Sequence, residues 1–143
     1  MEAYLIATAC TKFEKKADQT FKSLTEEVYC DLLKSAKVEN GDMIGQAWFG
    51  NCGMGTFGQN NIRGQVCFTP LVQKKLFPER VGIINVEGGC ATGSMAFHGA
   101  WKDVISGTED VSLAIGVEKI YQPNQPKKIQ EIYDGGIDQF DRN

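Results

Sequence analysis

The chain is poor in several residue types, and each shortage excludes a class of site. Its 143 residues include a single histidine, His98, and five cysteines that lie at least 15 residues apart with no Cys-x-x-Cys pair. This spacing suits neither a zinc site nor a disulfide framework. We therefore expect no metal and no bound cofactor, and we expect most of the thiols to be reduced and buried.

Long hydrophobic runs and clusters of like charge are also absent. No apolar run approaches the roughly 20 residues that cross a membrane, and no basic region precedes the apolar N-terminal residues as it would in a signal peptide. The net charge is only −3, and the basic pairs Lys15-Lys16 and Lys127-Lys128 are isolated, which leaves no electrostatic footprint for nucleic acid. We expect a cytoplasmic protein that binds neither membranes nor nucleic acid.

What is present is the composition of one globular domain. Hydrophobic residues make up 42% of the chain, enough for a single core. Short apolar runs predict strands, and apolar residues at steps of three and four predict an amphipathic helix that is capped by Asp18 or Thr20 and ends at Asn40-Gly41. The strands are expected at residues 3–9, 43–49, 81–86 and 111–120, and the later helices at 62–76 and 91–106. This alternation predicts an α/β fold with a mostly parallel sheet and helices on both faces.

The character of the chain changes after residue 121. Residues 122–128 (QPNQPKK) have the composition of a linker, and the polar, acidic residues 131–143 form no complete element. We therefore divide the chain into an α/β domain at residues 1–121 and, at residues 122–143, a linker with the start of an incomplete loop domain.

The most informative stretch is residues 85–94, NVEGGCATGS. It places Cys90 where an apolar strand passes into a helix, which is where open α/β sheets bind ligands. The amino end of a helix favours a thiolate, and Gly88 and Gly89 leave room for a substrate beside the sulfur. The alternative is that Cys90 is only a small residue at a crowded helix start, because the following helix is rich in small residues and is expected to be central and buried.

Three motifs in this half of the chain resemble the nucleophile region of the thiolase superfamily. They are residues 90–94 (CATGS), the turn at 107–110 (GTED) and the strand end at 116–120 (GVEKI). The CATGS form is most similar to the sterol-carrier-protein-type branch. Upstream, residues 58–63 (GQNNIR) resemble the Gly-Gln-Asn-Pro-x-Arg helix start of the family with Asn61 in place of proline, and residues 9–13 (ACTKF) resemble its first turn. The resemblance covers residues 3 to about 121 and implies the fold of a thiolase N-terminal domain.

The resemblance also implies an activity. Thiolases are acyl-CoA C-acyltransferases of lipid metabolism, including β-oxidation, that cleave a 3-oxoacyl-CoA thiolytically or run the reverse Claisen condensation. Cys90 would be the nucleophile that carries the acyl group as a thioester, with coenzyme A as co-substrate. Relatives dimerise through the strand at residues 83–86 (Ile83, Ile84, Asn85 and Val86), and some work with a small zinc-ribbon/OB-fold partner, so we expect a homodimer and allow for such a partner.

The chain departs from the family in one important respect. Thiolases take an activating histidine from a Gly-His-Pro motif and a second acid/base group from a C-terminal half, and this sequence contains neither motif. His98 lies eight residues after Cys90, about 12 Å along a helix, and is expected to be a core histidine. We therefore interpret the chain as the N-terminal portion of a thiolase that does not turn over alone. A non-catalytic thiolase-like scaffold subunit and a retro-aldol carbon–carbon lyase of the same fold are the alternatives.

Two further patterns are weaker. Residues 53–58 (GMGTFG) satisfy the G-x-G-x-x-G pattern, but they follow the second strand and the acidic Glu79 lies in a turn, so a dinucleotide site is not favoured and a loop near the catalytic cleft is expected. Glu118 is expected to be a structural carboxylate without a catalytic role. The aromatic residues expected in the core are Trp48, Phe49, Phe97 and Trp101.

Overall fold

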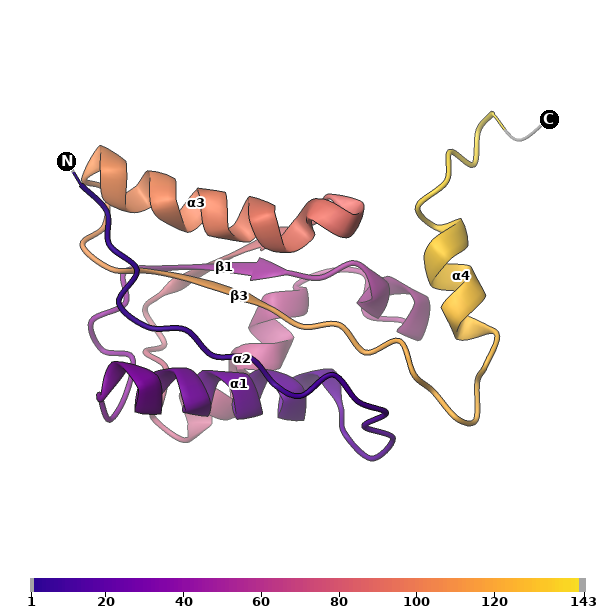
Figure 1. Ribbon diagram of the computed structural model, residues 1–143, viewed down its shortest axis with the longest axis horizontal. Coiled ribbons are helices and arrows are strands. Elements are labelled where there is room, and N and C mark those ends of the chain that lie inside the picture. The colour runs from indigo at the N-terminus through magenta and orange to yellow at the C-terminus, as the bar shows by residue number, and fades with distance from the viewer. Residues whose placement is uncertain (1, 142–143) are drawn as a thin grey trace.

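A three-stranded parallel sheet lies at the centre of the computed structural model, which describes residues 2–141. The strands are β1 (Gln46–Gly50), β2 (Gly82–Val86) and β3 (Ser112–Gly116), in the order β2-β1-β3. Helices α1 (Phe21–Ala36) and α2 (Arg63–Gln73) cover one face, and α3 (Thr92–Ser106) covers the other (Figure 1). The predicted α/β class, with a parallel sheet and helices on both faces, is confirmed.

Helix α1 begins with a capping box, in which two residues satisfy each other's backbone. The Thr20 hydroxyl accepts from the backbone N–H of Ser23 at 3.1 Å, and the Ser23 hydroxyl accepts from that of Thr20 at 2.8 Å. Thr20 is therefore the cap, one of the two residues proposed for it. The helix ends before the predicted Asn40-Gly41 stop, because Lys37 already adopts a left-handed conformation with φ 58°.

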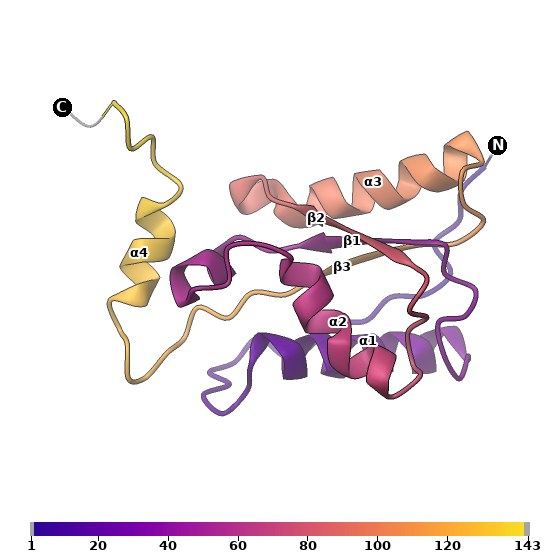
Figure 2. The same cartoon turned by 180° about the vertical axis from the view of Figure 1, so that it is seen from behind.

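The core lies between the sheet and the α1/α2 layer, which Figure 2 shows from behind. Its centre is a cluster of four buried aromatic rings that meet edge to face at 4.5–6.3 Å between centroids, a favourable arrangement of ring quadrupoles. The cluster consists of Tyr29, Phe49, Phe68 and Phe77. The Tyr29 hydroxyl donates to the Leu76 carbonyl at 3.0 Å, and burial raises the pKa of this phenol. The expectation that Phe49 belongs to the core is confirmed.

The three strands end in register, which positions the candidate site. Gly50 of β1 is paired with Val86 of β2 and with Gly116 of β3. Because the strands are parallel, the three loops that follow them leave the same edge of the sheet. Residues 51–53, 87–92 and 117–118 are therefore brought together, although they lie far apart in the sequence.

The predicted first strand at residues 3–9 is wrong. Within residues 2–141, no backbone hydrogen bond pairs this segment with β3, although it runs alongside that strand (Figure 1). Tyr4, Leu5 and Ile6 are 77%, 68% and 66% exposed. A continuous apolar run is typical of a strand covered on both faces, but no described element covers the outer side of this one.

Helix α3 packs closely on the sheet with one face only. A Cβ placed on Gly99 would lie 2.4 Å from the Trp48 ring, so the glycine is what allows α3 to lie close to β1. Nothing lies within 4 Å of a Cβ placed on Gly93, which is on the open side of the helix. The opposite face carries the exposed Phe97 and Trp101 (55% and 44% exposed). The prediction that α3 is central and buried therefore holds for one face only, and the assignment of these two aromatics to the core is wrong. Trp48 itself is half-buried.

Three other expectations are revised. Helix α2 is shorter than predicted and includes Pro70 in its interior. Residues 53–58 form a short 3₁₀ helix (Gly53–Phe57) that ends at the left-handed Gly58, rather than an open loop. The region after residue 121, expected to hold no complete element, contains the short helix α4 (Lys128–Asp134). In the described part of the chain, no helix combines the length and apolar character needed to cross a membrane.

Candidate active site at the carboxyl edge of the sheet

Cys90 lies in the turn that joins β2 to α3. Residues Gly89–Ala91 form one turn of 3₁₀ helix, and α3 begins directly after it at Thr92. The thiol is therefore placed at the amino end of a helix and beyond the carboxyl end of a parallel strand, the location that the sequence predicts. The side chain is exposed, so a reagent from solvent can reach it.

The two glycines before Cys90 have different structural roles. Gly89 has φ +56°, a left-handed conformation that side chains disfavour, and nothing lies within 4 Å of a Cβ placed there. A Cβ on Gly88 would instead lie 2.1 Å from the Met95 sulfur. The open space beside the thiol is thus on the Gly89 side, because the Met95 side chain occupies the space next to Gly88.

Thr92 and Cys52 hold this turn in place. The Thr92 hydroxyl donates to the Gly89 carbonyl at 2.7 Å and accepts from the Gly88 N–H at 2.9 Å. The Cys52 thiol lies 2.9 Å from the same hydroxyl and 3.1 Å from the Gly89 carbonyl oxygen. A cysteine from the loop after β1 is therefore in direct contact with the peptide unit that precedes Cys90.

Glu118 holds the loop that carries Cys52. Its carboxylate accepts from the backbone N–H groups of Cys52 and Gly53 at 3.0 Å each, and from the Asn51 side-chain amide at 3.2 Å. Such charge-assisted hydrogen bonds are stronger than neutral ones. The structural role expected for Glu118 agrees with these contacts. They also occupy the amide of Gly53, the first residue of the G-x-G-x-x-G segment, which a phosphate would need.

Arg63, the first residue of α2, connects the same loops from the other side. One guanidinium nitrogen donates to the Asn51 carbonyl at 2.7 Å, and the other lies 3.2 Å from the Glu87 carboxylate. The guanidinium side chain is only 13% exposed. Arg63 therefore connects the residue that follows β2, three residues before Cys90, to the residue that follows β1.

His98 does not reach the thiol. It lies two turns further along α3, on the exposed face, where its ring stacks on Trp101 at 5.4 Å between centroids and 13° between planes. The expectation that it is a core histidine is wrong, because it lies on the face of α3 that packs on no described element. Within residues 2–141 there is thus no histidine in a position to act as the base for Cys90.

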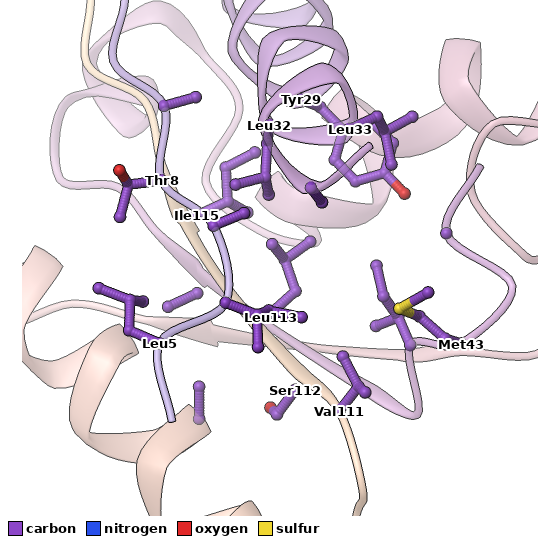
Figure 3. Close-up of a pocket in the computed structure, with 18 of the residues that line it drawn as sticks. Leu5, Thr8, Tyr29, Leu32, Leu33, Met43, Val111, Ser112, Leu113 and Ile115 are labelled. Carbon is purple, nitrogen blue, oxygen red and sulfur yellow. The ribbon is translucent and has the colours of Figure 1, made fainter. Parts of the chain in front are cut away.

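A cavity of the structure lies away from Cys90, which is not among its lining residues. It is a groove of about 500 Å³ between the N-terminal segment, α1, β3 and α3. Figure 3 labels Leu5 and Thr8 of the N-terminal segment, Leu113 and Ile115 of β3 and Leu32 of α1 among the residues that line it. Its walls are mostly apolar and include no cysteine, histidine or carboxylate, so we place the chemistry at the carboxyl edge of the sheet and not in this groove.

Cys67 shows how a different environment affects a thiol. It is fully buried in the core, and burial raises its pKa, outweighing the opposing hydrogen bond with Thr25. A neutral buried thiol is a poor nucleophile. Of the five cysteines, Cys67 is the one whose surroundings most clearly oppose reaction.

The sequence interpretation missed Cys52, Thr92 and Arg63 as parts of the site. Thr92 belongs to the CATGS motif, and Arg63 to the resembling helix start, so both were visible but had no assigned role. Cys52 follows the predicted second strand by only a few residues, and the ends of parallel strands meet at one edge. That rule could have identified it once the strand order was known.

This architecture defines the class: a parallel α/β domain that presents an exposed cysteine at a strand-to-helix turn. Residues 3–135 match the family described as thiolase, N-terminal domain. The chain is 32% identical over 117 residues to the benzoylsuccinyl-CoA thiolase subunit BbsB of Thauera aromatica. The aligned residues make up 82% of this chain and 28% of that protein. It is also 32% identical over 117 residues to an acetyl-CoA acetyltransferase of Methanocaldococcus jannaschii, covering 81% of this chain and 28% of the relative.

The chain belongs to the thiolase family, whose members named here are acyltransferases or thiolases. A third relative, an acetyl-CoA acetyltransferase of Methanothermobacter thermautotrophicus, is 28% identical over 121 residues, which cover 81% of this chain. The chain spans 28–29% of the length of these relatives. The family match runs past residue 121, and the division of the chain there stays a prediction.

Proposed function

We propose that Cys90 is the acyl-carrying nucleophile of a thiolase-type acyl-CoA C-acyltransferase. The observation that carries the proposal is the position of Cys90, exposed on the turn that precedes α3 in a chain of the thiolase family. The amino end of a helix presents unpaired N–H groups and a partial positive charge, and both stabilise a thiolate. A thiolate attacks carbonyl carbon readily, and the resulting thioester keeps the acyl group reactive.

The proposed reaction uses coenzyme A as co-substrate. The Cys90 thiolate attacks the keto carbon of a 3-oxoacyl-CoA, the bond between C2 and C3 breaks, and the leaving enolate of acetyl-CoA takes up a proton. The shortened acyl group stays on Cys90 as a thioester. The thiol of coenzyme A then attacks this thioester, which releases acyl-CoA and restores the Cys90 thiol; the reverse direction is a Claisen condensation.

The base that activates Cys90 would come from outside residues 2–141, from a further segment or from another polypeptide. His98 stacks on Trp101 away from the thiol, and Cys52 contacts the turn but is itself a thiol. We therefore expect residues 1–143 alone to form little acyl-enzyme and not to turn over. Acyl transfer would require the whole protein as it exists in its own cells.

Trapping the acyl-enzyme tests the proposal. The protein purified from its source cells, with whatever polypeptides accompany it, is incubated with acetyl-CoA, quenched in acid and digested for mass spectrometry. We expect a hydroxylamine-labile acetyl group on Cys90 and none on the same peptide of Cys90→Ala. Acetyl on another cysteine, or on none, contradicts the proposal; loss of labelling with intact assembly would favour the scaffold alternative.

We further propose a cytoplasmic homodimer that works in lipid metabolism of the β-oxidation type. Strand β2 is at an edge of the sheet, and its Ile84 is 38% exposed. An open edge of this kind is a template for pairing with a second strand. The word "subunit" in the name of the Thauera relative supports a multi-subunit context, in which a small zinc-ribbon/OB-fold partner would have a place.

A further inference from the structure

Two of the five cysteines lie in neighbouring loops of the candidate site, and the proposed acyl transfer requires only one of them. Cys90 lies four residues past the end of β2, and Cys52 lies two residues past the end of β1, its neighbour in the sheet. Gly50 and Val86 are paired at the strand ends. The loops that carry Cys52 and Cys90 therefore leave the sheet at the same edge.

The Cys52 sulfur lies 3.1 Å from the Gly89 carbonyl oxygen. That oxygen is two covalent bonds from the nitrogen of Cys90, so the thiol of Cys52 is directed at the backbone of the nucleophile candidate. A disulfide requires Cα atoms about 4.4–6.8 Å apart. Nothing lies within 4 Å of a Cβ built on Gly89, so the backbone beside Cys90 is open on that side. The disulfide would form by a local rearrangement of this turn, against the Thr92 hydrogen bonds that hold it.

The remaining cysteines are placed where they do not compete. Cys67 is buried in the core, on the α1/α2 side of the sheet. Cys30 belongs to α1, on the face of the sheet opposite to α3 (Figure 1). Cys10 is exposed on the N-terminal segment, where its thiol donates to the Thr11 carbonyl at 3.3 Å.

We propose that Cys52 and Cys90 form a thiol pair that reacts with hydroperoxides. The Cys90 thiolate attacks the O–O bond, which breaks; one oxygen stays on sulfur as a sulfenic acid, and the other leaves as water or an alcohol after taking up a proton. The Cys52 thiol then displaces water from this sulfenic acid and forms the Cys52–Cys90 disulfide. The two thiols lose two electrons, and the peroxide gains them.

The asymmetry of the two thiols assigns these roles. Cys90 is exposed and reaches a peroxide first, whereas Cys52 is half-buried and touches the turn from inside. A resolving thiol has to be close to the sulfenic acid, not open to solvent. The disulfide would block Cys90 reversibly and protect it from further oxidation, so this inference rests on the reactivity of Cys90 that the proposed function assumes.

The test is a peptide map after mild peroxide treatment. The reduced protein is exposed to hydrogen peroxide, free thiols are blocked with N-ethylmaleimide, and the digest is analysed without reductant. We expect one Cys52–Cys90 cross-linked peptide, formed in a yield independent of protein concentration and removed by dithiothreitol. In Cys52→Ser, whose hydroxyl keeps the polar contacts with Gly89 and Thr92, we expect no cross-link and a dimedone-trapped sulfenic acid on Cys90.

Matched variants and a second readout separate this inference from the proposed function. Cys30→Ser is expected to keep the cross-link, and near-ultraviolet circular dichroism checks that each variant is folded. Two results overturn the inference. One is a Cys90 sulfinic or sulfonic acid together with a free Cys52 thiol in the unmodified protein, and the other is a disulfide from Cys90 to Cys10 or Cys30. If acetyl-CoA still labels Cys90, the proposed function survives that result; if neither reaction occurs, both fall.

Discussion

At the scale of single residues, the turn before α3 depends on one backbone conformation and one hydroxyl. Gly89 adopts φ +56° with no neighbour within 4 Å of a Cβ, so its requirement is conformational and not steric. Thr92 then joins the carbonyl of Gly89 and the N–H of Gly88 through a single oxygen. Together they fix the backbone on which Cys90 sits.

Substituting Gly89 tests the conformational argument. Gly89→Ala is expected to lower the free energy of unfolding by about 1–2 kcal/mol, the cost of a left-handed conformation for a residue with a Cβ. Gly89→Asn is expected to lower it less, because asparagine tolerates this region better. Urea denaturation of the three proteins measures the differences; equal stability of all three would contradict the assigned conformation.

At the scale of elements, the sequence predicts well what depends on local pattern. The alternation of strands and helices and the Thr20 cap both follow from nearby residues. The position of Cys90 was predicted for the same reason, since it depends only on where one strand ends and one helix begins.

What depends on neighbouring elements was not predictable in this way. Periodicity shows that α3 has an apolar face but not how much of the helix is covered, so His98 and Trp101 were placed in the core and lie outside it. The apolar run at residues 3–9 has the pattern of a strand, but in the structure it pairs with none. The contact between Cys52 and Gly89 requires the order β2-β1-β3, which no local pattern contains.

The packing of α3 on the sheet can be tested at one position. Gly99→Ala would place a Cβ 2.4–2.6 Å from the Trp48 ring, and this ring is held by a 2.6 Å hydrogen bond from its nitrogen to Asp103. We expect a loss of roughly 1–3 kcal/mol, as for other overpacked sites. Gly93→Ala, on the open side of the same helix, is expected to be neutral or to stabilise by up to about 1 kcal/mol. Similar effects of both substitutions on the urea midpoint would contradict the packing.

The attachment of α1 to the segment before it predicts a pH dependence. Lys16 donates to both carboxylate oxygens of Glu27 at 2.7 and 2.9 Å, and Gln19 adds a third bond at 2.9 Å. The hydrogen bond from Lys16, followed by that from Gln19, lowers the pKa of Glu27. A carboxyl with a lowered folded-state pKa stabilises the fold above its unfolded pKa, and this contribution is lost as the pH falls through the folded value.

Glu27→Gln is therefore expected to destabilise the protein at pH 7 and not in acid. Because the pair is partly exposed, the loss at pH 7 should be only about 0.5–1 kcal/mol. Urea denaturation of both proteins from pH 7 to pH 3 measures it, and the difference should shrink as the pH falls. A difference that is constant or grows toward low pH contradicts the ion pair.

At the scale of the whole molecule, the open edge of β2 is expected to pair with a second copy. Ile84→Lys places a charge on this edge, where it would be desolvated in a dimer, and is expected to convert the protein to a monomer in light scattering at micromolar concentration. Tyr133→Lys changes an exposed residue on α4 (61% exposed) and should leave the dimer unchanged. If the unmodified protein is a monomer, or if both variants dimerise, the proposed interface is wrong.

The central claim, that the turn before α3 makes Cys90 a nucleophile, is tested most directly by the alkylation rates of all five cysteines in one sample. Iodoacetamide is added to the reduced, folded protein at neutral pH, and peptide mapping follows each thiol over time. Cys10 is the matched comparison, because it is also exposed but lies at no helix terminus. A helix-terminus effect of about 0.3–1 kcal/mol corresponds to a rate roughly two- to fivefold higher. We predict that Cys90 reacts first by this margin and the buried Cys67 last; a Cys90 no faster than Cys10 would contradict the account.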